Sequence, residues 1–104
     1  MKSLSMTLGL IAALGLAQNV TAANLYAGKA QAAMVCSQCH GIVNPSADAP
    51  FPPLAGRDEA YLKMALKQYR DKTRQSDIMN NIAGSLSDQD IENIMSYYSG
   101  LKPE

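Results

Sequence analysis

The chain has 104 residues, which is enough for a single domain, and 47% of them are hydrophobic. Its nine basic and nine acidic side chains cancel, which argues against nucleic acid as the main partner, because phosphate binding needs a basic excess. Two cysteines and one histidine are too few for a disulfide scaffold, or for a zinc site built from Cys and His alone.

Residues 1–23 are predicted to be a secretory signal peptide. A single lysine near the start is followed by an apolar run from Leu8 to Ala17, which is too short to span a bilayer. Small residues come next, and they favour cleavage after Ala22 or Ala23. We therefore expect export to an oxidising compartment. An uncleaved membrane anchor is the alternative.

The mature domain, residues 24–104, reads as three helices joined by loops, so the predicted fold class is all-α. The first helix is predicted from Asn24 to about Gln38, since it is rich in alanine and begins at a residue that favours helix caps. Gly28 within it costs about 1 kcal/mol relative to alanine. Such a glycine often marks the close approach of another segment, although a solvated face also tolerates one. Residues 41–56 contain four prolines and are predicted to form a loop.

The second helix is predicted from Asp58 to about Lys72, with Asp58 or Arg57 at the cap. One face is apolar at helical spacing, with Tyr61, Leu62, Ala65, Leu66 and Tyr69. The opposite face carries a basic stripe of Lys63, Lys67, Arg70 and Arg74. This basic stripe is either a docking face for an acidic partner or an ordinary solvated helix face.

The segment from Thr73 to Leu86 is predicted to be a loop. The last helix begins at Ser87, where Asp90 three residues later completes a pattern like a capping box. Gly100 suits the C′ position at its end. Its apolar positions are Ile91, Ile94, Met95 and Tyr98, with Tyr97 at their border.

The sequence Cys36-Ser37-Gln38-Cys39-His40 carries the chemistry. It is the C-x-x-C-H pattern of covalent haem attachment. Cysteines three apart at the end of a helix lie on one face, where two thioethers can reach one edge of a porphyrin. His40 can then bind the iron. The alternatives are a thioredoxin-like redox pair, half of a zinc site and a structural disulfide.

A second iron ligand is expected to be methionine, because His40 is the only histidine. The mature chain offers Met34, Met64, Met79 and Met95. Met34 lies beside the attachment site, and Met64 and Met95 lie within predicted helices, where methionine usually fills a core. Met79, in the predicted loop, is therefore assigned as the distal ligand.

With these motifs the chain resembles the class I c-type cytochromes, in particular their small bacterial periplasmic branch, whose domains also occur as halves of two-haem cytochromes. The resemblance covers residues 24–104. It rests on Ala27-Gly28-Lys29, the Cys36–Gly41 motif, Phe51-Pro52-Pro53-Leu54-Ala55-Gly56, Tyr61-Leu62, the segment from Arg74 through Met79, Leu86-Ser87-Asp88, and Ile91 through Tyr98.

The resemblance implies a small cytochrome c fold around one covalent haem c. Pro52 would offer its carbonyl to the ring N–H of His40, and Leu54 would line the haem pocket. Gly28 would let the first helix cross the last one closely, against Tyr97 or Tyr98.

The expected function is that of a soluble periplasmic one-electron carrier rather than an enzyme, because His/Met ligation leaves the iron no open position. Its partners would be dehydrogenases or oxidases met through transient interfaces, with neither nucleic acid nor a permanent membrane span involved. One alternative is a dedicated cytochrome subunit of a periplasmic dehydrogenase complex. The other is a peroxidase or ligand sensor in which Met79 is detached.

Overall fold

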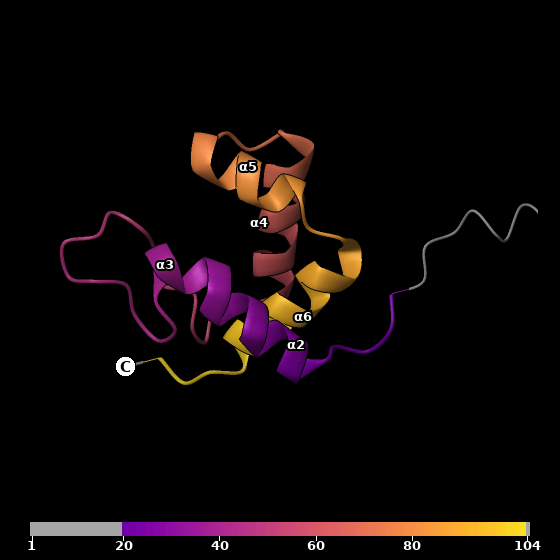
Figure 1. Cartoon of the computed structure of the whole chain (residues 1–104), viewed down its shortest axis with the longest axis horizontal. Helices are drawn as coiled ribbons and strands as arrows, with labels where there is room; N and C mark the ends of the chain where they lie inside the picture. The colour runs from indigo at the N-terminus through magenta and orange to yellow at the C-terminus, as the bar shows by residue number, and fades with distance from the viewer. Residues whose placement is uncertain (1–19, 104) are drawn as a thin grey trace, which may run out of the picture.

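The computed structural model describes residues 20–103, so most of the predicted signal peptide lies outside the described residues. Within this range the chain is helical and contains no strand, which confirms the all-α prediction (Figure 1). The same residues include no helix with the length and apolar character needed to cross a bilayer. The elements are α2 (Leu25–Gln31), the π-helical segment η1 (Ala32–Cys36), α3 (Ser37–His40), α4 (Glu59–Asp71), α5 (Asp77–Gly84) and α6 (Asp88–Ser99).

The first predicted helix is a continuous run of α2, η1 and α3. Asn24 caps it as expected, since its side chain accepts a hydrogen bond from the backbone N–H of Ala27 at 3.0 Å. The run widens into the π-helical segment just before the first cysteine, and such widenings are frequent at functional sites. It ends at His40, where Gly41 has a φ of 67°. The C-x-x-C-H motif therefore occupies the last turns of this helical run.

The predicted loop from Thr73 to Leu86 is wrong, because it contains helix α5. Ser76 caps this helix by accepting a hydrogen bond from the N–H of Met79 at 3.2 Å. Asp77 lies in its first turn, where a negative charge suits the helix dipole. The segment is only eight residues long and includes two asparagines and a glycine, which are weak helix formers. Met79 thus lies on a helix and not in a loop.

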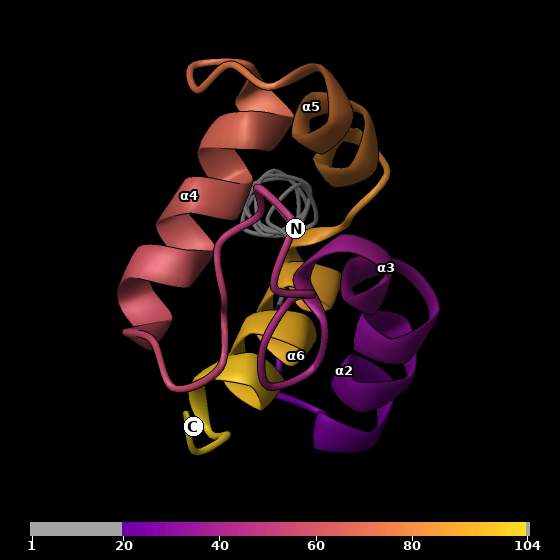
Figure 2. The same ribbon diagram turned by 90° about the vertical axis from the view of Figure 1, so that its left-hand side faces the viewer.

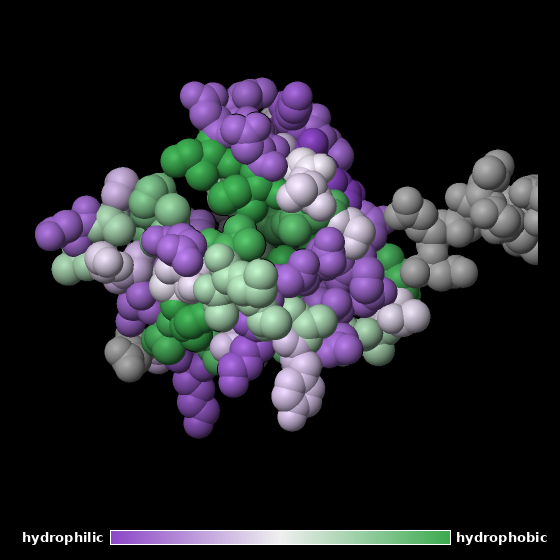
Figure 3. All heavy atoms as spheres, viewed as in Figure 1, coloured by the Kyte–Doolittle hydropathy of each residue, from purple (hydrophilic) through white to green (hydrophobic). Residues whose placement is uncertain are grey.

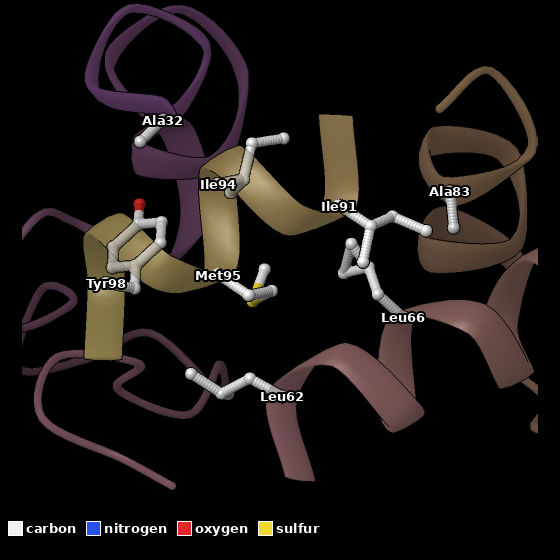
Figure 4. Close-up of a cluster of buried hydrophobic side chains, with 8 residues drawn as sticks. All are labelled: Ala32, Leu62, Leu66, Ala83, Ile91, Ile94, Met95 and Tyr98. Atoms are coloured by element: carbon white, nitrogen blue, oxygen red, sulfur yellow. The ribbon is translucent and has the colours of Figure 1, made fainter. Parts of the chain in front are cut away.

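Helix α6 forms the centre of the fold and contacts both α2 and α4 (Figure 1). The predicted capping box is present, with Ser87 and Asp90 bonded to each other's backbone N–H groups. Gly100 ends the helix as its C-cap residue with a φ of −79°, one position before the predicted C′. The four apolar positions predicted for this helix are the largest fully buried side chains (Figure 4): Tyr98, Ile91, Ile94 and Met95.

Helix α4 packs on α6 through Leu62 and Leu66, two members of its predicted apolar face (Figure 4). Two members of the basic stripe, Lys63 and Arg70, join the same two helices. Lys63 lies 2.8 Å from Glu59 and 2.7 Å from Glu92 of α6. Arg70 lies 2.7 Å from Asp88 of α6, and Arg74 stacks on the rings of Tyr61 and Tyr69. These three cations make contacts within the fold, so the stripe is not simply a solvated face.

Gly28 lies where α2 crosses α6. A Cβ atom at this position would come within 2.1 Å of the carbonyl oxygen of Asn93 and 3.2 Å of the amide nitrogen of Ile94. The close crossing is therefore as predicted, and the atoms nearest to that Cβ belong to Asn93 and Ile94 rather than to Tyr97 or Tyr98. The backbone of α6 is the nearest obstacle.

We expect Gly28→Ala to lower the free energy of unfolding by about 2 kcal/mol, because overpacking two helix backbones forces them apart. Gly84→Ala is the matched control, since a Cβ there meets nothing within 4 Å. Chemical denaturation of both variants and the parent protein measures the effect. Equal stability of the Gly28 and Gly84 variants would contradict the close crossing.

Candidate functional site

A cleft of about 200 Å³ is lined by residues of η1, α3, the loop after α3, α4, α5 and α6. Figure 2 shows how these elements are arranged, with α4 and α5 facing α3 and the loop after α3 passing in front of α6. Figure 3 shows hydrophobic residues gathered between α5 and the α3 region. The apolar walls of the cleft include Phe51, Leu54, Leu62, Ala65, Leu66, Ile78, Ile82 and Met95.

The C-x-x-C-H motif forms one wall of this cleft. Cys36 ends η1, while Cys39 and His40 belong to α3, and all three line the cavity. Both cysteines are free thiols. Burial raises the pKa of Cys36 to about 11, whereas a thiol of a redox pair works with a lowered pKa. The chemistry of Cys36 therefore disfavours the thioredoxin-like alternative.

The imidazole of His40 is held by the loop that follows α3. Its Nδ1 atom lies 2.7 Å from the carbonyl oxygen of Pro52. The ring centroids of His40 and Phe51 are 6.0 Å apart. Since a carbonyl oxygen can only accept, Nδ1 carries the proton in the neutral ring. Nε2 then keeps its lone pair, which is the arrangement that a metal-binding histidine needs.

Tyr98 fixes the start of the same loop. Its hydroxyl donates a hydrogen bond to the carbonyl oxygen of Gly41 at 2.9 Å. Burial raises the pKa of Tyr98, so the hydroxyl keeps its proton and remains a donor. The left-handed backbone of Gly41 leaves no room for a side chain, because a Cβ would lie 2.0 Å from the carbonyl oxygen of Asn44. The loop that carries Pro52 is thereby anchored to the core.

Met79 lines the cleft from α5, a different element from the one that carries the cysteines. Of the other methionines of the domain, Met34 is 72% exposed and Met64 is 44% exposed, and neither lines the cleft. Met95 does line it, but from within the core, where it is 1% exposed. The six residues singled out in the sequence all border this one cavity: Cys36, Cys39, His40, Pro52, Leu54 and Met79.

Two arginines at the cleft escaped the sequence analysis. The guanidinium of Arg57 lies 5.3 Å from the ring centroid of Tyr61, and that of Arg74 lies 5.7 Å from the same centroid. Both arginines line the cleft, and no carboxylate does so among the described residues. Their positions in the sequence did not indicate a place at the cleft, since Arg57 directly precedes a helix cap and Arg74 belonged to the basic stripe.

The donor set fits a haem bound through sulfur. One wall presents two thiols and an imidazole with a free lone pair, and Met79 borders the same space with a thioether. The remaining walls are apolar, as a porphyrin face requires, and the two guanidinium groups suit its carboxylates.

Comparisons with known proteins agree with this chemistry. A family model described as "Cytochrome c" matches residues 25–102. The cytochrome c4 of Pseudomonas aeruginosa is 40% identical over 100 residues, covering 96% of this chain and 47% of the relative. A protein of Stutzerimonas stutzeri named as a thiosulfate dehydrogenase electron acceptor is 38% identical over 69 residues, covering 64% of this chain and 32% of that protein.

The structure of the cytochrome c4 of Acidithiobacillus ferrooxidans has the same fold. It superimposes with a TM-score of 0.71 at 27% identity, covering 81% of this chain and 53% of that one. This chain spans about half the length of that protein and of the cytochrome c4 of P. aeruginosa.

Proposed function

Since the chain belongs to the cytochrome c family, we propose that it is a monohaem electron carrier of the periplasm whose iron is held by His40 and Met79. Membership of this family means electron transfer through a covalently bound haem c, and no enzyme activity of its own. When bound, the haem supplies a one-electron couple between Fe(III) and Fe(II). One observation carries the finer proposal: an imidazole and a thioether from separate elements border the same apolar cleft as the two cysteines.

The side chains of the cleft have distinct tasks. Cys36 and Cys39 would hold the cofactor through thioethers, and Pro52 would orient His40 through the 2.7 Å contact at Nδ1. Leu54 would exclude water from the ring, which favours the less charged reduced iron. Two permanent ligands leave no position for oxygen or peroxide, which suits outer-sphere electron transfer.

Domain organisation and location complete the proposal. Residues 1–23 would direct export and be cleaved after Ala22 or Ala23, leaving residues 24–104 as the cytochrome c domain. The chain contains one C-x-x-C-H motif, so it would carry one haem. Its partners would be periplasmic dehydrogenases or oxidases.

The main alternative is a permanent subunit of a periplasmic dehydrogenase complex. The relative named as a thiosulfate dehydrogenase electron acceptor supports this alternative. We expect the haem protein to purify from its native periplasm as a single chain, read by haem staining and mass spectrometry. The control is the same purification after mild crosslinking, which should capture a transient partner. Recovery with a larger chain in fixed ratio, without crosslinker and through several columns, would favour the subunit.

A further inference from the structure

The side chain of Asn80 forms hydrogen bonds with three backbone groups. Its Nδ2 donates to the carbonyl oxygen of Tyr69 at 2.7 Å and to that of Arg74 at 2.9 Å. Its Oδ1 accepts from the backbone N–H of Ser76 at 3.0 Å. Carbonyls only accept and a backbone N–H only donates, so the partners fix the orientation of the carboxamide. No other amide side chain in the described part of the chain holds three backbone groups.

These three bonds tie α5 to the end of α4. Tyr69 lies in the last turns of α4, and the chain then reverses at Lys72, whose φ of 66° is left-handed. Arg74 and Ser76 lie in the connection to α5. One carboxamide therefore holds the end of one helix, the connection and the start of the next.

Ser76 carries this constraint to Met79. Its hydroxyl accepts from the N–H of Met79 at 3.2 Å, and its carbonyl accepts from the N–H of Asn80 at 2.7 Å. Asn80 and Ser76 thus hold each other, and Met79 lies within the turn that they close. An isolated helix of eight residues is marginal in water, so its place depends on contacts of this kind.

We propose that Asn80 is a positioning residue for Met79, which keeps the thioether directed to the cleft by fixing the first turn of α5 against α4. This inference rests on the proposed function, in which Met79 is an iron ligand. A thioether is a flexible, uncharged ligand, so its hold on the iron depends on the placement of the helix that carries it. Asn80 itself is absent from the cleft lining and acts only through that placement.

Two substitutions at Asn80 test the proposal. Asn80→Ala removes all three bonds. Asn80→Asp keeps the size and the acceptor for the Ser76 N–H, but it turns a carboxylate oxygen toward two carbonyl oxygens. Asn81→Ala is the matched control, because Asn81 is the same residue type on the same helix and is exposed.

The measurement is the affinity of the ferric holoprotein for imidazole, read from its absorption spectrum. Imidazole competes with Met79 for the iron, so a loosened ligand raises the apparent affinity. We expect both Asn80 variants to bind imidazole about tenfold more tightly than the parent, in line with the loss of partly buried hydrogen bonds. The weak red band of methionine-bound ferric iron should fade in parallel, and Asn81→Ala should match the parent.

A double variant separates positioning from general loosening of the fold. In a Met79→Ala background, Asn80→Ala should leave imidazole affinity unchanged, because there is no ligand left to position. A tenfold increase in that background would overturn the proposal, as would parent-like affinity in both single Asn80 variants. If Met79→Ala itself leaves the affinity unchanged, the ligand assignment in the proposed function is wrong, and the inference falls with it.

Discussion

Replacing both Cys36 and Cys39 with alanine is expected to abolish covalent haem and to leave a chain without a stable fold. The buried hydrophobic core is small and includes four alanines, and a domain of this size is marginal without a cofactor or crosslink. The apolar walls of the cleft would also face water in the unloaded chain. Haem staining of a denaturing gel and thermal unfolding followed by circular dichroism measure the two effects.

Gln38→Ala is the control for this experiment. Gln38 lies between the two cysteines and is exposed, so its variant should take up haem and unfold like the parent. A single Cys36→Ala or Cys39→Ala change should retain one thioether and intermediate stability. A double cysteine variant that folds compactly and melts like the parent would show that the cofactor does not stabilise the domain.

Met79→Ala is expected to lower the reduction potential and to open the iron to added ligands. The fall should be about 0.2 V, a fraction of the ~0.8 V that axial ligands span, because methionine favours the reduced iron. Imidazole affinity should rise on the order of 100-fold, which corresponds to about 2.7 kcal/mol. Redox titration and ligand titration of the purified holoprotein provide both values.

Met64→Ala provides the contrast. Met64 lies on α4, is 44% exposed and does not line the cleft, so this variant should keep the parent's potential and imidazole affinity. If Met64→Ala changed both values while Met79→Ala changed neither, the distal ligand would be misassigned. Met95 is unsuitable as a control because it is buried in the core.

The long helices could be predicted because each carries its own signals. Asn24, Asp58 and Ser87 cap their helices in the structure as their side chains indicate, and the apolar spacing of α6 identified the four largest buried side chains. The attachment motif likewise depends on local spacing at the end of a helix. In these cases the local sequence alone is enough to predict the helix and its cap.

The features that escaped prediction depend on contacts between distant segments. Helix α5 is short and poor in helix formers, and Asn80 holds it through the backbone of α4 and the connection. The resemblance implied the crossing at Gly28 but not the residues of α6 that lie nearest to it, since the spacing of one helix does not fix the register of another. The two arginines of the cleft could be found only once the fold brought them beside Tyr61.

One measurement tests the central claim most directly, namely the mass of the tryptic peptide that contains the attachment motif. No lysine or arginine occurs between Lys29 and Arg57, so trypsin releases residues 30–57 as one piece with both cysteines and His40. The protein should be made in a host that matures c-type cytochromes. The account predicts this peptide with one haem attached through Cys36 and Cys39, resistant to acid extraction. The bare peptide, recovered from a colourless but folded protein, would contradict it.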